Sequence, residues 1–273
     1  MILRRVIQHF RNQEWTAIGI DFLIVVVGVF MGIQVSNWNQ AQTDKHLGEK
    51  FTERLKADLV VEAWNYAALI EYLVDVQSNT DKALAGLQGT IDISDEQLLI
   101  AAYRATQFNA GIRQRTTYDE LISTGKIGFI ADKTLVNTAL LIYDTRILDQ
   151  VNDEGVNSAY RVTFRKSLPV AIQDSVGQHC GDRFVPTGDF NDIKNQLNYP
   201  CSTNLSAQQI ELAVKLLRDN PAIVENLRLR AMDVRTQHNN LVISNQDIFE
   251  ALKNIKNAAT PQKTMTSDTS PAQ

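Results

Sequence analysis

The first strong pattern in the chain is an almost unbroken apolar run from residue 15 to residue 35, in which Asp21 is the only charge. As an α-helix these 21 residues would be about 31 Å long, which matches the roughly 30 Å hydrocarbon core of a bilayer. Twelve Leu, Ile, Phe and Val side chains each favour insertion by about 0.3 to 0.6 kcal/mol, whereas one Asp opposes it by about 2.5 to 3.5 kcal/mol. The pattern therefore predicts a transmembrane helix over residues 15–36.

Aromatic and polar residues mark both ends of this predicted span. Trp15 and Trp38 stand where amphipathic rings settle at a membrane surface, and amide side chains just after the run return the chain to water. A signal peptide would need small residues at a cleavage site directly after the apolar run, and the sequence Ile-Gln-Val-Ser-Asn at residues 33–37 does not supply them. We therefore expect a retained anchor in contact with the lipid bilayer.

The distribution of basic residues predicts the orientation of the span. Three arginines precede it, whereas the 15 residues after Val35 contain two lysines and two acidic residues. Because cytoplasmic flanks carry the excess of Lys and Arg, we expect residues 1–14 in the cytoplasm and residues 37–257 on the periplasmic side of a bacterial inner membrane. The three arginines are Arg4, Arg5 and Arg11.

Beyond the span, apolar positions recur at intervals of three or four residues. This spacing begins at Leu47 and predicts an amphipathic helix that ends near Gly86. No Pro or Gly interrupts the chain between Ile33 and Leu47, so we expect the transmembrane helix to be continuous with this long helix. Three aromatic side chains along it are expected in the core or at an interface: Trp64, Tyr66 and Tyr72.

Capping patterns predict the remaining helices, and the expected fold class is all-α because no convincing alternation of apolar and polar residues indicates strands. A helical bundle outside the membrane should follow the long helix. We expect irregular structure over 177–204 and a disordered, polar tail over 258–273. The predicted helices cover about 95–109, Thr117 to Gly125 and Asp132 to Asn152, then both sides of a break at Pro169, a segment that starts at Ser206 with Gln209, and a last segment from Asn220-Pro221 to Lys256.

Cys180 and Cys201 are the only cysteines, and they flank a stretch rich in turn-forming residues. In an oxidising compartment such a pair can close a loop, so we predict a disulfide, and the alternative is two unlinked thiols. A metal site that used His179 and Asp182 beside the two cysteines would lack the paired spacing of known zinc sites, so we expect no metal.

Two stretches carry a resemblance to known proteins: "DFLIVVVGVFMGIQVSNWNQ" and "TYDELISTGKIGFIADKTLVNTALLIY". Together they resemble a family of uncharacterised bacterial envelope proteins with a single N-terminal transmembrane helix. The resemblance implies that topology followed by a helical domain, and it implies no activity. The matching positions in the first stretch are Asp21, Gly28, Gly32, Gln34, Asn37, Trp38 and Asn39.

The predicted span also has a face suited to contact with another helix. At about 100° per residue, five residues fall within an arc of about 80°, and Gly28 with Gly32 would let a second helix approach closely. A carboxylate on this face would look for a donor, so we expect a homo-oligomer or a contact with another membrane protein. The alternative is that the glycine spacing is incidental and Asp21 faces water near the surface. The five residues are Asp21, Val25, Gly28, Gly32 and Val35.

Charge and motifs exclude several classes of function. The formal net charge is −4 and no basic, aromatic-rich patch occurs, so we expect no nucleic acid as partner. No nucleophile, phosphate-loop, dinucleotide or metalloprotease motif is present, so the sequence predicts no catalytic residue and no cofactor. Two hypotheses remain: a helical interaction or sensing domain without chemistry of its own, or a membrane-tethered periplasmic hydrolase or lyase with no recognisable motif.

Overall fold

The computed structural model describes residues 15–109, 111 and 113–259, and side chains from residue 19 onward. Every regular element within these ranges is a helix, so the all-α prediction is confirmed. The predicted cytoplasmic segment 1–14 and nearly all of the predicted tail 258–273 lie outside the described residues.

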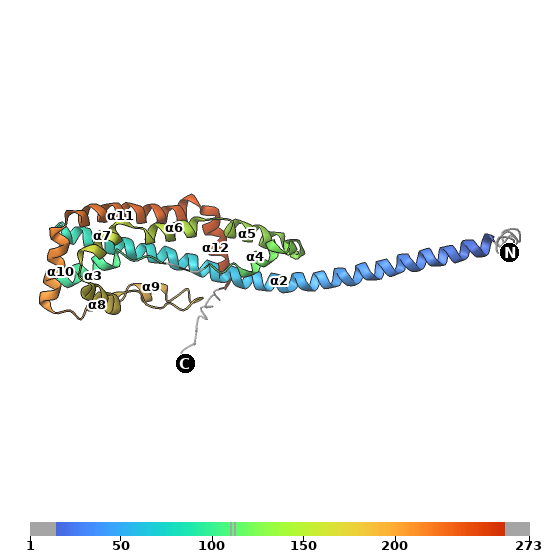
Figure 1. Cartoon of the computed structure of the whole chain (residues 1–273), viewed down its shortest axis with the longest axis horizontal. Coiled ribbons are helices and arrows are strands. Elements are labelled where there is room, and N and C mark those ends of the chain that lie inside the picture. The colour runs from blue at the N-terminus through green and yellow to red at the C-terminus, as the bar shows by residue number, and fades with distance from the viewer. Residues whose placement is uncertain (1–14, 110, 112, 260–273) are drawn as a thin grey trace, which may run out of the picture.

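The spine of the molecule is α2 (Trp15–Leu87), a single helix of 73 residues and about 110 Å. Figure 1 shows its N-terminal half leaving the bundle unaccompanied, while its C-terminal half runs between the other helices. The predicted continuity of the apolar and amphipathic segments is therefore confirmed. An 18-residue window of α2 has a mean hydropathy of 2.0 and none of it is buried, so this helix is long and apolar enough to cross a membrane.

The remaining helices surround the C-terminal half of α2, and α3, α11 and α12 make the most extensive contacts with it. The elements in chain order are α3 (Asp95–Arg104), α4 (Thr116–Ser123), the 3₁₀-helix η1 (Lys126–Phe129), α5 (Lys133–Tyr143), α6 (Ile147–Val156), α7 (Ala159–Ser167), α8 (Val170–Cys180), α9 (Ile193–Leu197), α10 (Ala207–Asp219), α11 (Pro221–Asn239), the π-helical turn η2 (Asn240–Ser244) and α12 (Gln246–Ala259).

Four predicted helix starts are confirmed by their capping side chains. Ser94, Asp132, Ser206 and Asn220 each accept a hydrogen bond from a backbone N–H in the first turn of the helix that follows, and Ser206 forms the full capping box with Gln209. These bonds satisfy amide groups that a helix N-terminus leaves without partners. The predicted break at Pro169 is confirmed as well, between α7 and α8.

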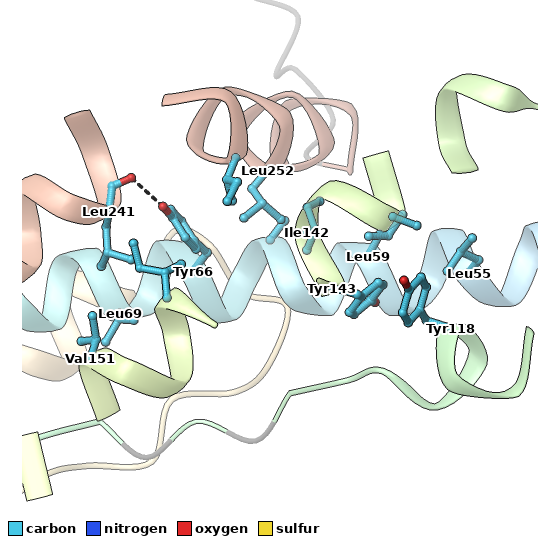
Figure 2. Packing of buried hydrophobic residues seen from close by; sticks show 14 of the residues in the cluster. Leu55, Leu59, Tyr66, Leu69, Tyr118, Ile142, Tyr143, Val151, Leu241 and Leu252 are labelled. Atoms are coloured by element: carbon cyan, nitrogen blue, oxygen red, sulfur yellow. Dashed lines mark hydrogen bonds between the residues drawn. The ribbon is translucent and has the colours of Figure 1, made fainter. Parts of the chain in front are cut away.

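Two helices predicted to be continuous are interrupted. The helix that starts after Asp132 ends at Tyr143, and α6 begins only at Ile147. Between them the Asp144 carboxylate accepts a hydrogen bond from Tyr118 Oη at 2.7 Å, which ties this residue to α4. The last predicted helix is divided by η2, where the Leu241 carbonyl accepts a hydrogen bond from Tyr66 Oη at 2.6 Å (Figure 2). At both interruptions, a tyrosine from a distant segment donates a hydrogen bond to a residue beside the break.

Three predicted boundaries were also wrong. Thr117 does not cap α4, because the helix begins at Thr116 after the N-cap Arg115. Thr117 therefore lies in the first turn, where its N–H donates to Asp58 Oδ2 at 3.0 Å. The first helix after α2 ends at Arg104 rather than near residue 109. The segment 177–204 is only partly irregular, because α8 extends to Cys180 and α9 lies within it.

The core is built on the amphipathic half of α2, as predicted. Figure 2 shows Leu55, Leu59, Tyr66 and Leu69 of α2 among residues from α4, α5, α6, η2 and α12. Trp64, Tyr66 and Tyr72 are buried, which agrees with their predicted place in the core or at an interface. A second apolar cluster at the far end of the domain joins α3, α7, α8, α10 and α11 to the last turns of α2.

A buried ion pair fastens the connection between α3 and α4 to the spine. Glu62 of α2 is completely buried, and its Oε2 lies 3.1 Å from Arg113 Nε while its Oε1 accepts the backbone N–H of Gln114. Arg113 also donates to the carbonyl oxygens of Thr145 and Ile142. Since every charge in this group has a partner, the pair fixes where the connection crosses α2, and removal of one partner would leave a buried charge uncompensated.

From residue 19 onward, Gly48 is the first residue of α2 that is buried, where the helix meets η1, and a Cβ atom there would overlap the backbone oxygen of Phe129. We expect Gly48→Ala to lower the free energy of unfolding by about 1–3 kcal/mol, because a backbone neighbour cannot move aside as a side chain can. Chemical denaturation in detergent would measure it. Gly128→Ala is the matched control, because a Cβ atom there has nothing within 4 Å. Equal stability of the two variants would contradict the close approach.

Candidate functional site

A loop whose two ends meet at a pair of cysteines crosses the outer face of α2. The sulfur atoms of Cys180 and Cys201 lie 2.17 Å apart and their Cα atoms 5.5 Å apart, so the predicted pair is at disulfide-bonding distance. Cys180 is the last residue of α8, and Cys201 lies four residues after the end of α9. We call residues 181–200 the crossing loop. It contains α9 and passes beside α2 on the side away from α11 (Figure 1).

Arg104 organises the base of the crossing loop. Its Nε donates to the Cys180 carbonyl at 3.1 Å and its Nη2 to the Tyr199 carbonyl at 3.1 Å, and Nη2 also lies 3.6 Å from Cys201 Sγ. The guanidinium stands over the Tyr199 ring, 4.6 Å from its centroid, and Tyr199 Oη donates to the Gly181 carbonyl. The last residue of α3 therefore binds both ends of the loop at once.

The middle of the crossing loop is attached to α2 by a mixed set of contacts. Trp64 Nε1 donates to the Asp189 carbonyl at 3.1 Å, and Ile193 of α9 packs against Trp64 and Ala68. Lys194 Nζ lies 3.5 Å from Glu71 Oε1 in an ion pair exposed to solvent, which contributes little. The indole bond and the apolar contact therefore account for most of this attachment.

Tyr72 and two carboxyl groups form a polar cluster under the loop. Tyr72 Oη donates to Asp182 Oδ2 at 2.7 Å, and Asp75 lies one helical turn further along α2. Burial raises the pKa of Tyr72 well above its usual value, and the neighbouring Asp182 charge adds to the shift. Tyr72 is therefore a neutral hydrogen-bond donor at physiological pH.

The same surroundings disfavour negative charge on both carboxyl groups. Burial raises the pKa of Asp75, with Arg104 opposing the shift and Asp182 adding to it. Burial also raises the pKa of Asp182, although part of this residue is exposed, and the bond from Tyr72 and the charges of Arg104 and Arg161 oppose that shift. The cluster thus joins α2, α3 and the crossing loop through groups whose charges depend on one another.

Two cavities lie on either side of this cluster. The larger, of about 750 Å³, lies between α2, α3 and the end of the loop, and Asp75 and Arg104 are in its wall. The smaller, of about 290 Å³, lies between α2, α6 and the start of the loop, and Tyr72 and Asp182 are in its wall. Leu197 of α9 lines both, so the cluster and this side chain separate the two spaces.

Of the sequence-predicted site residues, the structure brings only Cys180 and Cys201 into this region. The five residues of the predicted association face lie on the exposed half of α2, about 55 to 77 Å from Tyr72 at the helical rise per residue. Trp38 is exposed on the same helix, and the side chain of Trp15 lies outside the described residues. His179 contacts the Ser175 carbonyl on the surface of α8, and within the described ranges no three His, Cys, Asp or Glu residues gather as metal ligands.

Sequence reasoning missed Tyr72, Asp75 and Arg104 as members of a site. Tyr72 has the spacing of a core residue, and Arg104 falls inside the helix predicted over about 95–109 rather than at its end. In the sequence, Asp182 was a candidate only as a ligand of a metal site, and the spacing of that site's residues argues against it. Nothing in the local sequence indicates that these four residues meet.

No model of a known protein family matches the chain, and no curated protein and no solved structure is significantly similar to it. The function therefore has to follow from the chain's own geometry.

The raised pKa of Asp75 predicts a sign for the pH dependence of stability. A carboxyl whose pKa is raised in the folded state stabilises it fully below its ordinary pKa of 3.8, and this contribution is lost as the pH rises through the raised value. We expect the free energy of unfolding to fall over that interval, and to fall less in Asp75→Asn, which keeps an acceptor for Asn79 Nδ2.

Glu96 supplies a control of opposite sign. Hydrogen bonds from Thr203 and Ser202 lower its pKa, so Glu96→Gln should destabilise the protein at neutral pH and lose this effect on acidification. Denaturation measured from pH 3 to pH 7 distinguishes the two variants. A parallel pH profile for Asp75→Asn and the parent would contradict the account of Asp75.

Proposed function

We propose that this chain is a single-span protein of the bacterial inner membrane whose periplasmic helical domain binds a partner molecule, as an interaction or sensing domain. One observation carries the proposal: the apolar segment and the spine of the domain are the same uninterrupted helix. A soluble protein would bury so long an apolar stretch, whereas every large apolar side chain from Ile20 to Val35 is exposed.

The geometry of α2 suits a domain that is held at a fixed distance from the membrane. Residues 36–43 are all exposed, so about 12 Å of bare helix separates the apolar segment from the bundle. A continuous helix transmits rotation and displacement along its axis. A change at Tyr72 or Asp75 would therefore reach the span directly, as sensing requires.

The cysteine pair supports an oxidising location. A closed loop with a sequence separation of 21 would stabilise the fold by about 3 kcal/mol through loss of entropy in the unfolded chain. Disulfides persist in the periplasm and are rare in the cytoplasm. The pair thus agrees with the orientation that Arg4, Arg5 and Arg11 indicate.

The association face of the span is part of the proposal. A Cβ atom at Gly28 or at Gly32 would have no other atom within 4 Å, which leaves room for a second helix on this side. In lipid, close backbone packing and polar contacts supply the attraction between helices. We propose a second copy of the chain, or another membrane protein, as the partner of the face that carries Asp21.

The polar cluster favours a second candidate function, a membrane-tethered hydrolase or lyase. Asp75 and Asp182 have raised pKa values beside two cavities, which is the property of a general acid. Against it, the Tyr72 hydroxyl is held neutral as a donor to Asp182, and no Ser, Cys or His with a neighbouring base stands among the described residues that form the cluster. A binding domain accounts for the same groups without a reaction.

Topology can be tested with spheroplasts of cells that express the full chain. Added protease should degrade the domain over residues 37–257, and the two cysteines should resist alkylation until a reductant is added. A cytoplasmic protein serves as the control for intact membranes. Protection of the domain until lysis would overturn the proposed orientation, and two free thiols would remove its independent support.

Association of the span can be tested by crosslinking in the membrane. Replacement of both Gly28 and Gly32 by Ile should reduce crosslinking several-fold while membrane insertion is kept, because Ile blocks close approach and favours lipid. Gly19→Ile is the matched control: Gly19 is also open and exposed, and it faces about 160° away from Asp21. Undiminished crosslinking of the double variant would show that the glycine face is incidental.

A further inference from the structure

We propose that the cavity between α2, α3 and the end of the crossing loop binds a neutral saccharide through its hydroxyl groups. This inference rests on the proposed binding function and names the chemistry of its ligand. The volume of about 750 Å³ is typical of small-molecule sites. The wall on α2 extends from Glu71 to Lys82, about 16 Å at the helical rise, which gives space for more than one sugar ring.

Arg104 is a buried cation whose donors are not all used. It is only 9% exposed, and its Nε and Nη2 donate to the carbonyls of Cys180 and Tyr199. Among the described residues, no hydrogen bond or ion pair engages its Nη1. Nη1 also keeps accessible surface, because within the same ranges the only enclosed side-chain atoms without a partner belong to Gln77 and Asn152. Since Arg104 lines the cavity, it presents N–H donors to a ligand.

Asp75 presents an acceptor to the same cavity. The residue is partly exposed, and its Oδ2 accepts a hydrogen bond from Asn79 Nδ2 at 3.1 Å. No other side chain of the described ranges donates to this carboxyl group, and it forms no ion pair with Arg104. A hydroxyl group placed between the two would accept from Arg104 and donate to Asp75, whereas an ether or a hydrocarbon could not do both. The two residues therefore specify a group that is donor and acceptor at once.

The charges in the wall have both signs, which favours a neutral ligand. The ionisable lining residues are Glu71, Asp75, Lys82, Arg104 and Lys194. Glu71 and Lys194 form an ion pair at 3.5 Å, and Lys82 is exposed at the end of the wall, where water and salt screen its charge. A ligand anion would be repelled by Asp75 and a ligand cation by Arg104. An uncharged hydroxyl group suits both residues.

Side chains that both donate and accept hydrogen bonds line the rest of the polar wall. Amide and hydroxyl groups of this kind match the hydroxyl groups of a sugar. Gln97 of α3 is exposed, and its side chain makes no hydrogen bond within the described part of the chain. The full set is Ser78, Asn79, Gln97, Asn195 and Asn198.

A peptide fits this wall less well than a saccharide does. Peptides commonly bind along a sheet edge, in an apolar groove or on exposed aromatic rings. Every regular element of the described ranges is a helix, and the one aromatic residue that lines the cavity is Tyr199. Its ring is buried, and the guanidinium groups of Arg104 and Arg183 lie 4.6 Å and 3.3 Å from the ring centroid. The wall therefore offers hydrogen bonds rather than pockets for apolar side chains.

The test compares cellobiose with its fully O-methylated derivative, which keeps the oxygen acceptors and loses every donor. The full chain in lipid nanodiscs is titrated in a calorimeter, and empty nanodiscs give the blank. We expect cellobiose to bind at least about tenfold more tightly, since only its hydroxyl groups can donate to Asp75. Chitobiose, which carries two ammonium groups, and cellobionate, which carries one carboxylate, should both bind more weakly than cellobiose.

Two variants locate the site. Asp75→Ala removes the acceptor and should weaken cellobiose binding about tenfold, and Gln97→Ala should weaken it about threefold. Gln178→Ala is the matched control for Gln97, because Gln178 is exposed on α8 and does not line this cavity. Thermal unfolding of each variant verifies that the fold is kept. Arg104 is left unchanged, because it also holds both ends of the crossing loop.

Equal affinities of cellobiose and its methylated form, no heat above the blank, or tighter binding of a charged disaccharide would overturn the proposal. Tighter binding of acetylated and amidated triglycine would overturn it in favour of a peptide. An unchanged cellobiose affinity in both Asp75→Ala and Gln97→Ala would overturn the placement of the site. Topology and crosslinking measured on the same protein separate these outcomes from a failure of the proposed function. If both hold while cellobiose fails to bind, the ligand chemistry is wrong and the membrane-anchored architecture stands.

Discussion

The architecture depends on the unbroken backbone hydrogen bonding of α2. One helix has two kinds of surface: residues 20–35 present apolar side chains in every direction, and its second half presents a stripe that only a protein core can cover. Backbone hydrogen bonds continue through the polar stretch between Val35 and Gly48, because no Pro or Gly weakens the helix there. α3, α4, α9, α11 and α12 pack directly on this helix, and α7, α8 and α10 pack in turn on α3 and α11.

Polar side chains along α2 decide where distant segments attach. Glu62 holds Arg113, Tyr66 bonds to Leu241, and Tyr72 bonds to Asp182. Each pair joins α2 to a segment at least 50 residues away. Apolar packing tolerates small shifts along a helix, whereas a buried polar group has one partner and one position. These bonds therefore set the register in which the bundle and the crossing loop lie against the spine.

The difference between local patterns and contacts with distant segments explains which features the sequence could predict and which it could not. The long helix, the cap at Ser206 and the break at Pro169 follow from local spacing and chemistry, and these predictions were confirmed. The interruptions at Asp144 and near Leu241 were missed, because their partners Tyr118 and Tyr66 come from elsewhere in the chain. For the candidate site only the cysteine pair was predictable, since its two members are unique.

The polar cluster and the smaller cavity contain groups that lower the stability of the fold. This property connects them with binding. Burial opposes the ionised forms of Asp75 and Asp182, and Asn152 keeps an unsatisfied oxygen where an apolar side chain would pack without loss. Natural sequences violate packing and hydrogen-bonding rules at a few places, and these places are commonly functional. Here they gather between the spine and the crossing loop, next to the exposed Phe184. Since the spine continues to the membrane-sized segment, a ligand that satisfied these groups would contact the same helix that carries this segment.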